Sequence, residues 1–331
     1  MSGLISSKNT GLPTEIIEQI ICSIVETFDP FFEEDREPAG PRGSPERVAL
    51  CACLQVSSQF YDTAHRLLFN KIVVSAKPDD PSYISRRVDL LSALIESSDR
   101  LENSTKIRSI VKTAKILYIS NVHSVSDALR VSRIIEPIAQ ANEGPTGGRL
   151  NTLWIAAPTS FYPSGSWDAT DYPTATGPFW RGSLKLASSK SIWHLTLFRF
   201  PSIPCSTFVG CTYETMYLIE CGFDYRRWKR EIPWKANVDS ELERGGAPVI
   251  EYLHWQNHAR HFGGQERAAL FTLPNQEISN IKAVAFTIVP HAIRPNRGME
   301  VVPESILSTC LPFETIGIHI QEGKHDFSHH L

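Results

Sequence analysis

The chain has 331 residues, 42% of them hydrophobic, and a formal net charge of −3 at pH 7. This charge balance excludes the strongly basic surface that nucleic acid or an anionic membrane attracts. No stretch reaches the roughly 18 apolar residues of a membrane-spanning helix, and the first residues contain no signal-peptide core. The seven scattered cysteines are typical of reduced thiols. We therefore expect a protein of the cytoplasm or the nucleus.

The segment from Leu12 to Phe69 has helical periodicity in three short runs. In its first run, residues three and four apart place two apolar columns side by side on one helix. One column is Ile16, Ile20 and Ile24, and the other is Ile17, Ile21, Val25 and Phe28. A second short run follows, and Ser57 or Ser58 can cap a third. Three short helices form a very small core, so we expect part of this apolar surface to contact another protein.

The order of the motifs in this segment resembles an F-box. The opening Leu12-Pro13-Thr14-Glu15-Ile16-Ile17 is followed by Leu54-Gln55-Val56-Ser57 before Phe60, and then by Leu67-Leu68-Phe69. The resemblance covers about a fifth of the chain. It implies a three-helix module that binds the Skp adaptor of a cullin-type ubiquitin ligase. The rest of the chain would then bind the protein that is to be ubiquitinated.

The resemblance also implies which side chains contact the adaptor. They are Leu12, Pro13, Ile16, Ile20, Leu54, Val56, Phe60 and Leu68. Residues 30–46 form a spacer rich in Pro, Gly and charge that is longer than the family usually has. We expect it to be an inserted flexible loop, which costs little stability.

Beyond this segment, short strand-like runs alternate with helical stretches. A β-branched run at 71–74 comes first, and the others lie at 114–119, 150–155, 192–198, 215–219, 249–254, 283–288 and 314–320. Helices are predicted at 85–97, 127–140, 179–188, 266–271 and 304–310. A strand followed by a helix, recurring every 20 to 45 residues or so, is typical of a stacked repeat array with parallel strands.

This second part resembles the irregular leucine-rich-repeat-like arrays that follow F-boxes in many fungal proteins. The predicted fold class is therefore mixed α/β, with a three-helix F-box-like module and an array of strand–helix units. The alternative is a doubly wound α/β domain, although no Gly-rich turn follows the first strand. The predicted boundaries are 12–76 for the helical module, 77–106 for a helical linker, 107–322 for the array and 323–331 for a disordered tail.

Two long loops interrupt the predicted array, at 157–177 and 223–246. Both contain aromatic side chains, and the second also contains a basic run. Trp, Tyr and Arg dominate the energetics of protein interfaces, so one interpretation is target recognition. The other is that the aromatic side chains only hold the loops against the scaffold. The candidate target-binding residues are Trp167, Tyr172, Tyr225, Arg227, Trp228 and Trp234.

The sequence contains no recognisable catalytic or cofactor motif. The Gly-rich stretch 144–149 lacks the Gly-Lys-Ser/Thr ending of a phosphate-binding loop. His254, His258 and His261 have metal-ligand spacing only on a helix, whereas His254 ends a predicted strand. We therefore expect a protein that is not an enzyme and uses no metal or cofactor.

The predicted function is that of a substrate-recognition adaptor in a Skp–cullin–F-box ubiquitin ligase. Its partners would be a Skp-type adaptor, through it a cullin, and a target protein, with no nucleic acid and no membrane. The alternative is a non-catalytic repeat scaffold for protein–protein interaction, with a helical N-terminal cap and no ligase role.

Overall fold

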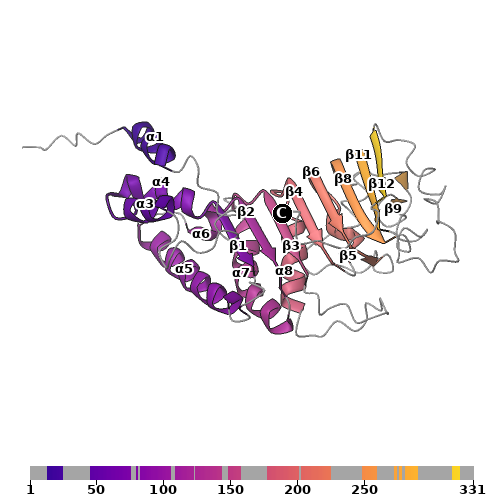
Figure 1. Cartoon of the computed structure of the whole chain (residues 1–331), viewed down its shortest axis with the longest axis horizontal. Helices are drawn as coiled ribbons and strands as arrows, with labels where there is room; N and C mark the ends of the chain where they lie inside the picture. Colours follow the sequence, from indigo (N-terminus) through magenta and orange to yellow (C-terminus); the bar gives the residue numbers. More distant parts are fainter. Residues whose placement is uncertain are drawn as a thin grey trace, which may run out of the picture.

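The computed structural model describes most of the central part of the chain. The described residues are 13–24, 45–75, 80, 83–105, 109–122, 124–143, 148–157, 177–200, 203–224, 248–258, 272–273, 276–277, 280–289 and 315–320. Three helices lie at one end, and an elongated sheet with helices along one side extends away from them (Figure 1).

The first three helices are α1 (Thr14–Ile24), α3 (Pro45–Cys53) and α4 (Ser58–Leu68), which we call the helical module. The Pro13 carbonyl accepts hydrogen bonds from the N–H groups of Ile16 and Ile17. Pro13 thus directly precedes the first turn of α1. The predicted cap of the third helix is confirmed, because the Ser57 hydroxyl accepts a hydrogen bond from the Phe60 N–H at 3.4 Å.

The helical module has its own small core, separate from that of the sheet. One apolar residue or more from each helix is buried in it: Ile17, Ile21, Leu50, Cys53 and Ala64. Half-buried side chains pack around this cluster, namely Leu54, Phe60, Leu67 and Leu68. So few buried side chains leave the module little hydrophobic stabilisation beyond what the chain entropy costs.

Beyond the helical module, the largest element of the described residues is an eight-stranded parallel sheet. Its strands are β1 (Lys71–Ser75), β2 (Ile116–Ser120), β3 (Thr152–Ala156), β4 (His194–Phe198), β6 (Thr212–Ile219), β8 (Val249–His258), β11 (Asn280–Val289) and β12 (Thr315–Ile320). All the predicted strand positions are confirmed. The strands lie side by side in the order of the chain. A doubly wound sheet reverses its strand order at a switch point, and the described strands contain no such reversal.

The first three crossovers between strands are helical. They consist of α5 (Tyr83–Thr105) with the short α6 (Ile110–Thr113), then α7 (Val125–Glu143), then α8 (Gly177–Ala187). The predicted helices at 85–97, 127–140 and 179–188 are confirmed, while 266–271 and 304–310 lie outside the described residues. Between β4 and β6 the described residues form the short strand β5 (Ile203–Pro204) and a 3-10 helix, η5 (Cys205–Phe208), in place of an α-helix.

Shorter strands complete the described part of the chain. Strand β5 (Ile203–Pro204) pairs in parallel with β7 (Phe223–Asp224). Strand β9 (Thr272–Leu273) pairs antiparallel with β10 (Gln276–Glu277).

Alternate residues of the strands form one continuous core under the helices. In register across the sheet lie Leu117, Leu153, Leu195, Met216, Leu253 and Val284, all buried. Two residues further along each strand, a second buried row contains Ile119, Ile155, Leu197, Leu218 and Trp255. Helices α5, α7 and α8 supply the opposite side of this core, and Figure 1 shows them together on one side of the sheet.

The same turn follows three of the strands. Asn121, Arg199 and Glu220 each come directly after a strand and have φ values of 52°, 61° and 52°. This left-handed conformation is costly for residues other than glycine. Backbone hydrogen bonds to the next strand stabilise it, from Arg199 N–H to Ile219 at 2.9 Å and from Glu220 N–H to Gln256 at 2.7 Å.

The turn directs the following apolar side chain back into the core. Val122, Phe200 and Cys221 occupy this position, and all three are buried. The Cys221 thiol donates to the carbonyl of Leu197, on the preceding strand of the sheet, at 3.2 Å. Burial raises the pKa of Cys221 to about 12, so the thiol stays protonated. The strands β2, β4 and β6, each with its following turn, therefore place apolar side chains in the core at the same positions.

Candidate functional site

Among the described side chains of α1, Ile17 and Ile21 of one apolar column are buried, and Ile16 and Ile20 of the other are exposed. Ile17 and Ile21 are 2% and 0% exposed, whereas Ile16 and Ile20 are 40% and 41% exposed. Helices α3 and α4 are the described elements that contact α1 within the module. Because they cover only one side of it, the column of Ile16 and Ile20 remains outside, and we call it the α1 outer face.

The other residues of the predicted adaptor-binding set do not all point outward. Pro13 and Val56 are exposed, but Leu54, Phe60 and Leu68 are half-buried against the core of the module. Leu12 lies outside the described residues. Val48 on α3 is exposed and was not among the predicted residues. In the sequence, Val48 is one more apolar residue in a helical run. Such a run does not show which side of the helix is exposed.

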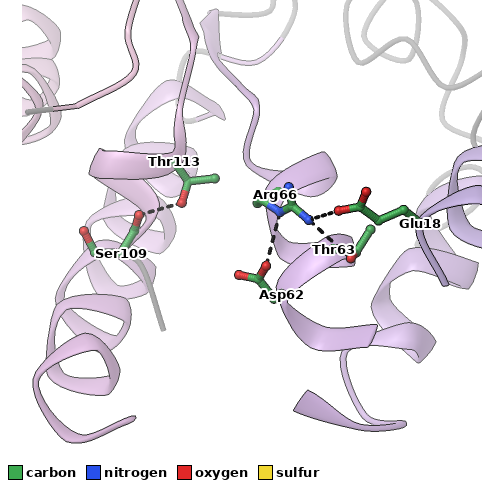
Figure 2. A network of polar contacts seen from close by, with 6 residues as sticks. All are labelled: Glu18, Asp62, Thr63, Arg66, Ser109 and Thr113. Atoms are coloured by element: carbon green, nitrogen blue, oxygen red, sulfur yellow. Dashed lines mark hydrogen bonds and ion pairs between the residues drawn. The ribbon is translucent and has the colours of Figure 1, made fainter. Parts of the chain in front are cut away.

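A network around Arg66 attaches α1 to α4 (Figure 2). The Arg66 guanidinium on α4 donates to the Glu18 carboxylate on α1 at 2.5 Å and lies 3.3 Å from the Asp62 carboxylate. It also donates to the Thr63 hydroxyl at 3.4 Å. These groups are partly exposed, so their attraction contributes little stability. They link α1 to α4 in the orientation in which Ile17 and Ile21 are buried in the core of the module.

His65 is a buried titratable residue on the same helix. Its ring stacks on Tyr61 with centroids 5.5 Å apart and lies 4.8 Å from the ring of Phe69. Desolvation lowers the pKa of His65, and the nearby Asp62 carboxylate offsets only part of this effect. The neutral imidazole is thus the form that fits the folded module.

The sheet has a second candidate surface on the side opposite the helices, which we call the open face. Its central row contains Tyr118, Trp154, Tyr217 and His254, in register on four strands. The rings of Tyr118 and Trp154 stack at 4.3 Å, and Phe198 lies 6.4 Å from Trp154. Tyr217 lies 5.9 Å from Tyr252 and 5.4 Å from His254. Aromatic side chains therefore form much of this half-buried surface.

Polar side chains of the open face contact one another, and His194 Nε2 also lies 3.7 Å from the Glu214 carboxylate. His194 Nδ1 lies 2.9 Å from the Thr215 hydroxyl, and His254 Nε2 lies 2.9 Å from the Thr287 hydroxyl. Burial, helped by Tyr217, raises the pKa of Tyr252 and keeps its phenol neutral. At the end of β4, Arg199 lies over the Phe198 ring at 4.4 Å and donates to Glu220 at 2.9 Å.

The target-binding residues predicted from the sequence do not lie on the open face as described. Trp167, Tyr172, Tyr225, Arg227, Trp228 and Trp234 all lie outside the described residues, so their role stays a prediction. The open face was missed, although its signal was present. The predicted strands carry an aromatic residue or histidine between two buried apolar residues, as Tyr118, Trp154, Tyr217 and His254 do.

Among the described residues, no group of three His, Cys, Asp or Glu side chains could hold a metal ion. His254 and His258 both lie on β8, where four residues span roughly 13 Å, and His261 is outside the described part. A separate finding is that none of the helices that the structure describes is long and apolar enough to cross a membrane.

Comparisons of the chain with protein-family models, curated protein sequences and solved structures gave no match. The F-box resemblance therefore depends on the motif residues alone. The geometry of the helical module and of the open face is the basis for the functional proposal below.

Proposed function

We propose that this protein is a substrate-recognition adaptor of a Skp–cullin–F-box ubiquitin ligase. The helical module would bind the Skp-type adaptor, and the sheet region, as an irregular leucine-rich-repeat-like array, would bind the target. No residue of the chain performs chemistry in this proposal. Binding two partners on one body raises the effective concentration of the target near the ubiquitin-carrying enzyme.

The α1 outer face is the observation that carries the proposal. Ile16 and Ile20 leave apolar surface in water on a helix whose Ile17 and Ile21 are buried. Single exposed apolar residues are common, but here Val48 on α3 and Val56 just after it add to the exposed apolar surface of the same small module. An apolar helix face that lies in a partner's hydrophobic groove is a recurring mode of recognition.

The consecutive order of the strands supports the repeat part of the proposal. Each described unit stacks only on its neighbours in the sequence, and the turn at Asn121, Arg199 and Glu220 recurs. Both features are expected of an array whose units cannot bury their apolar faces alone.

The test is a pull-down of a recombinant Skp-type adaptor with the full chain and with the Ile16→Asp variant. We expect this variant to lose binding, because an unpaired carboxylate in an apolar groove costs several kcal/mol, roughly 2–7 for a polar group without partners. The folded module should tolerate the change, since Ile16 is 40% exposed.

A matched control is Leu90→Asp, which places the same charge on an exposed apolar position of α5. This variant should retain the adaptor. Undiminished binding by Ile16→Asp, or no binding by the unaltered chain, would contradict the ligase proposal.

A second candidate function is a repeat scaffold whose helical module only caps the array. One observation favours it: Phe69, directly after α4, packs against the core of the sheet while Leu68 packs against that of the module. Such continuity is what a terminal cap requires. The same pull-down separates the two, because a cap retains no adaptor even when the thermal unfolding of the chain is normal.

A further inference from the structure

The open face is unusual for a surface that borders water, because it carries no ionisable carboxylate, ammonium or guanidinium group along two rows. From β2 to β11, these rows consist of Ile116, Tyr118, Thr152, Trp154, His194, Thr196, Thr215, Tyr217, Tyr252, His254, Ala283 and Ala285. A surface designed for solubility contains about 25–35% Lys, Arg, Glu and Asp. Twelve successive positions without one of them indicate a surface that loses its water when a partner binds.

The composition of these rows is that of an interface core. Tyr, Trp and Phe are enriched and charged residues are depleted at the centre of protein interfaces. Outside the rows, Lys71 on β1 lies in register with Ile116, and Arg199, directly after β4, is paired with Glu220 and stacked on Phe198. Charge complementarity therefore favours an uncharged partner segment over an acidic or a basic one.

The length of the rows indicates what shape that segment has. Neighbouring strands are about 4.8 Å apart, so the six strands from β2 to β11 span about 24 Å. An extended polypeptide rises about 3.1–3.3 Å per residue, and seven or eight residues cover this distance. A helix would need about sixteen residues for the same span and would be wider than the two rows.

The hydrogen-bonding groups of the open face suit a polyproline II conformation. In this conformation the backbone carbonyls have no internal partners. Trp154 carries a ring N–H, and Tyr217 and Tyr252 carry hydroxyls, all of which can donate to such carbonyls. Aromatic rings with donors at their edges are the surfaces that bind Pro-rich extended segments in known recognition modes.

We propose that the open face binds an extended, uncharged, proline-containing segment of a partner protein. The proposal builds on the function above in one respect, namely that this partner is the target of ubiquitination. The stacked pair Tyr118 and Trp154 provides the apolar surface for proline rings. Tyr217 and Tyr252 lie further along the same rows and receive the polar backbone.

The experiment selects a displayed library of random twelve-residue peptides on the purified full chain, without any adaptor present. We expect the enriched peptides to contain proline with apolar neighbours and to lack Asp, Glu, Lys and Arg. The strongest of them is then synthesised and its Kd is measured for the chain and its variants.

The decisive variant is Thr196→Lys, which introduces a charge between Trp154 and Tyr217 in the central row. We expect the Kd to rise at least tenfold. Leu129→Lys is the matched control, since Leu129 is an exposed residue of α7, on the helix side of the sheet. Its Kd should be unchanged.

Trp154→Leu keeps apolar bulk but removes the indole ring and its N–H donor, and we expect the Kd of this variant to rise at least fivefold.

Other outcomes would overturn the proposal. They are the absence of enriched peptides, enrichment of charged peptides, or equal binding by the chain and by folded Thr196→Lys and Trp154→Leu. If residues of the same chain already cover the open face, no peptide is enriched. Since the helical module is not involved, failure here leaves the adaptor pull-down unaffected, and the two proposals fail separately.

Discussion

The helical module and the sheet bury the same kinds of side chain but on different scales. The module has a small cluster around Ile17 and Ile21, whereas the sheet has one core that continues from β1 to β11. Each strand added to the sheet covers its predecessor, so apolar surface is buried as the array grows. Three short helices have no such successor, and α1 keeps Ile16 and Ile20 outside. The two candidate surfaces thus differ in origin. The α1 outer face is exposed because the core of the module is too small to cover it, whereas the open face is the side of the sheet that lies opposite the large core.

Removing a core side chain from the module should have the largest structural effect. Ile21→Ala loses about 2–5 kcal/mol of stability, which is comparable to all that a core of this size supplies. We expect the module to unfold while the sheet remains. Hydrogen exchange of the amides in α1, α3 and α4 would show it, with fast exchange confined to these helices.

The exposed neighbour on the same helix provides the control for this change. Ile20→Ala should alter stability by about 0.5 kcal/mol or less, as surface substitutions usually do. Equal losses from Ile20→Ala and Ile21→Ala would mean that α1 has no outer face.

In the sheet, Leu197→Ala should cost a similar free energy but leave the fold intact. Leu197 is fully buried between the equivalent residues Ile155 and Leu218, and the cavity costs about 2–5 kcal/mol. The larger core has more stability to lose, so the expected result is a lower Tm with native circular dichroism. Thr196→Ala, one residue earlier on the open face, should change the Tm much less, and an equal shift would contradict the assignment of the two faces.

The smallest expected effect is a dependence of module stability on pH through His65. The pKa of this residue is lowered in the folded state, so the unfolded chain binds the proton more readily. Stability is then fully present above the ordinary histidine pKa of about 6.5 and decreases as the pH falls below it. Chemical denaturation at a series of pH values measures this slope. His65→Phe keeps a ring between Tyr61 and Phe69 but cannot titrate, and an unchanged slope in this variant would assign the effect to another group.

The sequence predicted the elements well because their signals are local. The alternation of apolar residues that places Leu117 and Ile119 on one face is visible in six residues, and so is the helical spacing of Ile17 and Ile21. The sequence signal for which face of a strand, or which column of a helix, is covered by another element is not local. Ile16 and Ile17 are chemically identical neighbours, and only the positions of α3 and α4 decide that one is exposed and the other buried.

The candidate site was predicted only in part for the same reason. Leu54, Phe60 and Leu68 belong to the resemblance but contribute to the core of the module. Trp154 lies in the predicted strand 150–155, but its place in a row with Tyr118 and Tyr217 requires the register of four strands. Residues far apart in the sequence meet there, and no short window contains them.

The 3-10 crossover between β4 and β6 has a consequence for the shape of the sheet. Packed helices require about 8–10 Å between their axes, whereas neighbouring strands need about 4.8 Å. Where α5, α7 and α8 pack on the strands, this difference in width should curve the sheet away from the helices. The narrower 3-10 helix η5 does not add this extra width between β4 and β6. The part of the open face around Tyr118 and Trp154 should therefore be concave and contact a ligand from two sides. The part formed by the strands after β4 should be flatter.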